Sequence, residues 1–76
     1  MNNTYQLKLS YPGTLSLYNI TYLVESVKGV RIKHLSFISR GKLVAGVVIF
    51  EASDILKFNL VVRRIRAKKE VLIEEE

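Results

Sequence analysis

The chain has 76 residues, of which 49% are hydrophobic and 25% charged, and its formal net charge is +5. A chain this short forms one domain, which we place at residues 1–76. It has no cysteine and one histidine, His34, so disulfides, thiolate metal sites and a metal site built on histidines alone are excluded. Because a domain of this size buries only about 60% of its unfolded surface, we expect a partner subunit to add stability.

The apolar segments are too short for a membrane span. The longest, Leu43–Phe50, has eight residues, whereas a spanning helix needs roughly 20. The first residues, Met1–Thr4, lack the basic and apolar segments of a signal peptide. We therefore expect no membrane partner and a cytoplasmic location.

The first part of the chain combines a strand pattern with a helix pattern. Apolar side chains alternate over Thr4–Tyr11 and predict a half-buried strand. Pro12-Gly13 ends this strand. The apolar spacing that follows predicts a helix from an N-cap at Thr14 to Val27, with Gly29 just past its end.

Two further strands are predicted next. Val30–Ser39 is apolar on one side at its start and on the other side later, so either a bulge lies near Lys33-His34 or both faces are partly apolar. Arg40–Lys42 is typical of a hairpin turn. Leu43–Phe50 then predicts a third strand that is apolar on both faces.

The last part of the chain predicts a second helix and a short strand. Ser53 is the expected N-cap, with Asp54 in the first turn. Apolar spacings of three and four residues extend the helix to about Lys69. Val71–Ile73 is the expected last strand, before the acidic tail Glu74–Glu76.

This order of elements predicts an α+β, ferredoxin-like β-α-β-β-α-β domain: a four-stranded antiparallel sheet with two helices on one face. The open face of such a sheet should be polar, but Leu43–Phe50 is apolar on both sides. An exposed apolar surface usually marks an interface. We expect a homodimer or larger homo-oligomer, formed through this face or the adjoining edges, unless long neighbours such as Gln6 and Lys8 shield the strand.

The residues of known catalytic sites are missing. His34 has no acidic residue nearby in sequence and there is no cysteine, so a nucleophile beside a base is not expected. The acids fall at the ends of predicted elements, and four separate glycines make no phosphate-binding loop. We expect a protein that is not an enzyme and needs no cofactor or metal.

Two binding sites remain as hypotheses. The turn at Pro12–Leu15 opens a helix whose N–H groups suit a carboxylate, although an ordinary strand-to-helix turn has the same pattern. Cations also gather near the end of the second helix, where they either favour the helix dipole or bind nucleic acid. This cluster consists of Arg63, Arg64, Arg66, Lys68 and Lys69. RNA-recognition domains share the predicted order of elements, but their base-stacking aromatics are here reduced to Phe50.

The sequence resembles the ACT domain, a ligand-binding regulatory module of amino-acid metabolism. The resemblance lies in the strand that ends at Pro12-Gly13, the hydrophobic helix after it, and the Gly29–Ile32 segment that opens the second strand. Within that family, Arg31–Phe37 and Arg64–Leu72 are similar to the small regulatory subunit of acetolactate synthase.

This resemblance implies a non-catalytic domain that pairs with copies of itself and modulates a biosynthetic enzyme such as acetolactate synthase. By position, a small amino acid would bind between the backbone of one copy and the second strand of another. These residues are Gly13, Thr14 and Leu15 in one copy and Arg31 and Ile32 in the other. Ser10 and Arg31 stand where valine-sensing subunits have the Asn or Asp residues that hold the ligand's amino group, so valine is not the expected ligand. The alternative is an ACT-like domain that keeps the association surface but has lost the ligand pocket.

Overall fold

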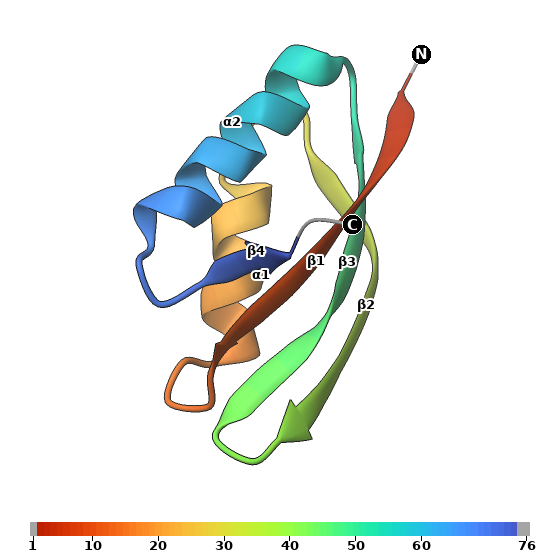
Figure 1. Ribbon diagram of the computed structural model, residues 1–76. Helices are drawn as coiled ribbons and strands as arrows, with labels where there is room; N and C mark the ends of the chain where they lie inside the picture. The colour runs from red at the N-terminus through yellow and green to blue at the C-terminus, as the bar shows by residue number, and fades with distance from the viewer. Residues whose placement is uncertain (1, 75–76) are drawn as a thin grey trace.

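The computed structural model describes residues 2–74 (Figure 1). A four-stranded sheet carries both helices on one face, and α1 and α2 pack against each other there. The elements in chain order are β1 (Asn3–Pro12), α1 (Leu17–Glu25), β2 (Arg31–Arg40), β3 (Leu43–Ala52), α2 (Ile55–Ala67) and β4 (Leu72–Glu74). None of the described helices is long and apolar enough to cross a membrane.

The strands lie in the order β2-β3-β1-β4, and every neighbouring pair is antiparallel. This confirms the predicted ferredoxin-like fold. β1 and β3 pair along ten residues, from Asn3 opposite Ala52 to Pro12 opposite Leu43. β4 covers only Lys8–Ser10 of β1. The acidic tail after Glu74 lies outside the described residues.

The predicted helix caps were each misplaced by one or two residues. Ser16, not Thr14, is the N-cap of α1, because its Oγ accepts a hydrogen bond from Asn19 N while Asn19 Oδ1 accepts one from Ser16 N. Asp54, not Ser53, is the N-cap of α2 and accepts a hydrogen bond from Lys57 N at 3.0 Å. Both predicted caps carry a hydroxyl group and lie within two residues of an equally good cap. Residue type alone does not distinguish between the two positions.

Both helices also end earlier than predicted. The first ends at Glu25 rather than Val27, and the chain turns at Gly29, whose φ of +87° favours glycine. The second ends at Ala67 rather than Lys69. Val27 and Val71 lie just outside regular elements but stay buried in the core, so the apolar pattern continued past the ends of the helices.

The bulge in β2 is confirmed. Ile32 is opposite Phe50 on β3, but the next paired residue, His34, is opposite Ile49, so Lys33 is the extra residue. The bulge reverses the alternation. As a result, Leu35 and Phe37 lie on the same side as Ile32 and pack against the core, which explains the irregular phase of this segment.

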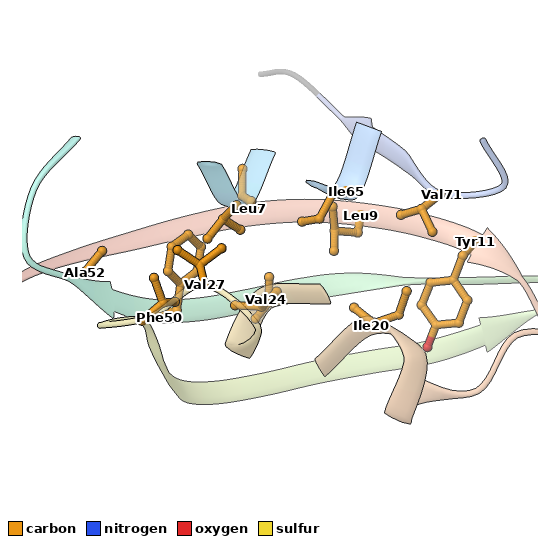
Figure 2. Packing of buried hydrophobic residues seen from close by; sticks show 13 residues of the cluster. Leu7, Leu9, Tyr11, Ile20, Val24, Val27, Phe50, Ala52, Ile65 and Val71 are labelled. Carbon is orange, nitrogen blue, oxygen red and sulfur yellow. The ribbon is translucent and has the colours of Figure 1, made fainter. Parts of the chain in front are cut away.

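The core lies between the helices and the sheet, as Figure 2 shows for Leu9, Phe50 and Ile65. These side chains are fully buried, and aromatic rings close one end of the core, where the Phe58 centroid lies 4.7 Å from the Tyr5 ring. The buried apolar residues are Leu7, Leu9, Tyr11, Ile20, Val24, Val27, Val30, Val48, Phe50, Ala52, Val61, Ile65 and Val71.

Gly46 is required where β2 and β3 meet. A β-carbon on this residue would overlap the Ser36 carbonyl oxygen and lie 2.6 Å from Phe37 Cα. The Phe37 ring occupies this space and packs against Tyr11, with 5.7 Å between the ring centroids. The absent side chain of Gly46 thus allows the Phe37 side chain of β2 to cover the central strand.

Candidate functional site

The turn between β1 and α1 is held by its own hydrogen bonds. Gly13 N donates to Lys42 O at 2.9 Å, and Leu15 N donates to Pro12 O at 3.0 Å. Ser16 N donates to the side chain of Asn19. Two of the three backbone donors predicted to meet a ligand are therefore already bonded within the chain: Gly13 N to the β2–β3 hairpin and Leu15 N within the turn. The N–H of Thr14 takes no part in these bonds.

Gly13 is not required by the backbone conformation of the turn. Its φ is not positive, and a β-carbon there would meet only Lys42 O, at an ordinary contact distance of 3.6 Å. Gly13 and Thr14 are exposed, while Leu15 is half-buried against the core. Substitution of Gly13 can therefore test ligand binding without breaking the fold.

The second group of predicted ligand residues lies at the start of β2. Arg31 is exposed, and Ile32 is half-buried. The N–H of Ile32 points off the edge of the sheet and donates to Glu25 Oε2 at 3.4 Å. Glu25 lies near the end of a helix, and its seven-residue separation from Ile32 gives no local signal in the sequence for this contact.

The two groups of ligand residues lie far apart in one chain. Pro12 at the turn is opposite Leu43 of β3, and Arg31 is opposite Glu51. Eight residues of β3 separate these positions, and at about 3.4 Å each they span roughly 27 Å. A single copy cannot place Thr14 and Arg31 around one amino acid.

The edge formed by β2 is free in its second half. Because Gly13 N donates to Lys42 O, the even-numbered residues of β3 form their backbone hydrogen bonds with β1. The odd-numbered residues, such as Ala45 and Val47, therefore direct their backbone groups toward β2. The β2 residues opposite them, Ile38 and Ser36, form the hydrogen bonds to β3. The backbone groups of the β2 residues in between point away from β3. The backbone groups of Leu35, Phe37 and Ser39 thus face the outer edge, and no described strand pairs with them.

The open face of the sheet is less exposed than its sequence indicated. Ala45, Val47 and Ile49 are half-buried within one chain. Their register neighbours include Lys8 beside Val47 and Gln6 beside Ile49, which is the shielding considered as the alternative to association. The most exposed apolar side chains of this face lie at its margins, at Ile38, Leu43 and Leu72.

The basic cluster lies at the C-terminal end of α2 and just beyond it. Arg63, Arg64 and Arg66 belong to the helix, where Arg64 and Arg66 lie in the last turn. Lys68 is half-buried and Lys69 is exposed. Cations in the last turn of a helix favour its dipole, and this location accounts for them without a nucleic acid.

The described residues hold no cluster of His, Cys, Asp and Glu that could bind a metal ion. His34 is exposed on β2. Burial raises the pKa of the Tyr11 hydroxyl, but this residue belongs to the core and lies beside Ile20 (Figure 2).

Comparison with known proteins supports the fold. No protein-family profile matches the sequence, and no curated protein matches it. Among solved structures, the chain is similar to the ACT domain from GTP pyrophosphokinase of Chlorobium tepidum, with a TM-score of 0.80. The match covers 97% of each chain at 10% sequence identity. The fold is therefore that of an ACT domain.

Proposed function

We propose that this chain is an ACT-type regulatory domain that binds a small amino acid between two copies. The observation that carries the proposal is the separation of the candidate ligand residues. The exposed Thr14 lies at one end of the sheet and Arg31 at the other, roughly 27 Å away. A shared site therefore requires a second copy.

Antiparallel pairing of two β2 edges would supply that copy. The free backbone groups are centred on Phe37, so a two-fold axis there pairs Leu35 of one copy with Ser39 of the other. Arg40 lies three residues after Phe37 and is opposite Leu43, which in turn pairs with Pro12. Arg31 lies six residues before Phe37, of which the bulge at Lys33 takes up one, so Arg31 of one copy would lie about two residues beyond the level of Pro12 in the other copy, toward Gly13 and Thr14.

The charge at this site favours a carboxylate. A guanidinium such as that of Arg31 carries a positive charge and matches a carboxylate with two parallel hydrogen bonds. The N–H and hydroxyl of Thr14 provide further donors. The ligand of this proposal is an amino acid held by its carboxylate. The regulated partner is a larger biosynthetic enzyme such as acetolactate synthase.

The proposal is tested by the mass of the protein in solution and by calorimetric titration with a panel of amino acids. We expect a dimer, saturable binding of at least one amino acid, and loss of that binding in Gly13→Val and Arg31→Ala. Arg64→Ala is the control, because Arg64 is an exposed cation of α2 and belongs to neither group of candidate ligand residues. A monomer at high concentration, or no heat with any amino acid, would contradict the proposal.

A second experiment tests the basic cluster. If Arg63, Arg64 and Lys69 bound nucleic acid, affinity would fall steeply with salt as counterions are released. We expect no gel shift with single-stranded or duplex probes even at low salt. A shift that disappears in Arg63→Ala/Arg64→Ala would favour the nucleic-acid function instead.

A further inference from the structure

The β2–β3 hairpin lies between the two groups of candidate ligand residues. Gly13 N donates a hydrogen bond to Lys42 O at 2.9 Å, so the turn between β1 and α1 touches the tip of the hairpin. Figure 1 shows the hairpin and this turn at the same end of the sheet. In the proposed dimer, the strand on the other side of the hairpin is β2 of the second copy. A ligand that reaches from Thr14 of one copy to Arg31 of the other therefore lies against the hairpin tip.

Two cations flank the tip of this hairpin. Arg40 ends β2 and Lys42 precedes β3, and both residues are exposed. Lys42 bonds to the turn through its backbone oxygen, so its side chain has no part in that contact. Among residues 2–74, neither side chain forms an ion pair. Two positive charges are thus available beside the turn.

The start of β2 supplies two further cations, Arg31 and Lys33, which are also exposed. With Phe37 on the two-fold axis, Arg40 of one copy is opposite His34 of the other. Lys33 and Arg31 of that other copy follow toward the start of its strand, just beyond the hairpin tip. Each end of the interface between the copies therefore gathers four cations, two from each copy.

Acidic residues do not balance these charges. The segments around the shared site, Ser10–Asn19 and Val30–Val44, contain the four cations and no acid. Two acids lie beside the start of β2, namely Glu25, which is bonded to the backbone of this strand, and Glu51, which is opposite Arg31. Even with both acids counted, the cations exceed them by two.

This excess of positive charge bears on the choice of ligand. An amino acid with an uncharged side chain is a zwitterion with no net charge, so it leaves the excess uncompensated. A second anionic group on the ligand compensates the excess, and charge complementarity of this kind gives specificity. Hydrogen bonds between such a group and a guanidinium or ammonium are also stronger than those between neutral groups.

We infer that the shared site takes an amino acid with a second anionic group, a carboxylate or a phosphate, on its side chain. Arg31 of one copy binds the α-carboxylate. Arg40 and Lys42 of the other copy bind the anionic group of the side chain. This inference rests on the proposed function and names the class of ligand for the same site.

The same charges couple the ligand to the dimer. Like charges that face each other across two strands are destabilising, so the ligand-free dimer carries repulsion at both ends of its interface. An anion that bridges the two sets of cations removes this repulsion. A ligand that binds the dimer but not the monomer shifts the equilibrium toward the dimer. An acidic amino acid should therefore strengthen association more than its uncharged analogue does.

The test compares acidic amino acids with uncharged analogues by calorimetry on the full chain. The pairs are L-aspartate with L-asparagine, L-glutamate with L-glutamine, and O-phospho-L-serine with L-serine. We expect the acidic member of at least one pair to bind roughly tenfold more tightly. The carboxylate and phosphate pairs show which anion the site takes. Sedimentation should show a stronger dimer with that acidic ligand than with its analogue.

Variants of the hairpin locate the second anionic group. Arg40→Gln and Lys42→Gln should each reduce the preference for the acidic ligand by roughly fivefold and leave the affinity for its uncharged analogue unchanged. Arg63→Gln is the matched control for the loss of one charge and should keep the full preference. Arg63 is two residues from each of the buried Val61 and Ile65, so it lies on the side of α2 that faces away from the sheet.

The outcomes separate this inference from the proposed function. Equal binding of both members in every pair would overturn the inference while leaving an amino-acid site between two copies. An unchanged preference in both Arg40→Gln and Lys42→Gln would do the same. A monomer at high concentration, or no heat with any amino acid, would overturn the proposed function and this inference together.

Discussion

β2 forms one edge of the sheet along ten residues, whereas the other edge is shared between the three residues of β4 and the first half of β1. The β2 edge is protected at its start by a bulge at Lys33 and by Glu25, and is open from Leu35 to Ser39. The β1 edge has no charged residue between Asn3 and Leu7. The two edges thus differ in protection, because a bulge and a bonded carboxylate block the start of β2, whereas neither device is found among the described contacts of Asn3–Leu7.

The largest expected effect tests the attachment of β2 to the rest of the sheet. Gly46→Ala should destabilise the protein by about 3 kcal/mol, because the new methyl group overlaps Ser36 and Phe37. Urea denaturation followed by circular dichroism measures the change. Gly13→Ala is the matched control and should change stability by less than about 0.5 kcal/mol. If Gly46→Ala lowered the stability no more than Gly13→Ala does, Phe37 would be able to move away from β3.

Proline substitutions compare the two edges directly. Ser39→Pro removes an outward N–H group of β2, so a symmetric dimer loses two hydrogen bonds, or about 2 kcal/mol and roughly thirtyfold in affinity. Gln6→Pro removes an outward N–H group of β1 and should leave the dimer unchanged. Proline is tolerated at sheet edges. Sedimentation at several concentrations checks both results. If Gln6→Pro alone separated the dimer, the copies would pair through the β1 edge and not through β2.

The helix caps should have moderate and equal effects. Ser16→Ala and Asp54→Ala each remove a side-chain acceptor from the first turn of a helix and should cost about 1 kcal/mol. Thr14→Ala and Ser53→Ala are the controls, because neither residue is a cap. Thermal unfolding of the four variants measures the differences. A larger loss of stability in Thr14→Ala or Ser53→Ala would instead support the caps predicted from the sequence.

The smallest effect concerns pH. Burial raises the pKa of Tyr11 above its ordinary value of 10.0, so the folded chain keeps this proton when the unfolded chain releases it. The contribution to stability is complete below pH 10 and is lost as pH rises toward the raised pKa. Denaturation at pH 8 to 11 should show a flatter decline in Tyr11→Phe than in the wild type. If the stability of both proteins fell equally with pH, the Tyr11 hydroxyl would be in contact with water.

The sequence alone determined the number, type and order of the elements. Alternation over Thr4–Tyr11 and the apolar spacings of the two helices are local signals that tertiary packing preserved, because each buries one side against the same core. The phase slip near Lys33 also predicted the bulge correctly as one of two alternatives. The turn at Pro12 and the location of the basic cluster at the end of α2 followed from the same local rules.

Only the tertiary structure decided the contacts between distant segments. Glu25 bonds to Ile32, Gly46 makes room for Phe37, and residues of β1, α2 and β4 together line a groove. None of these has a sequence signal, since each depends on how elements far apart in the chain pack together. The structure also placed Thr14 and Arg31 at opposite ends of the sheet, and for that reason the proposed shared site requires a second copy. Local pattern sets which elements form because it depends on neighbours in the chain, whereas edges, grooves and shared sites depend on how those elements pack.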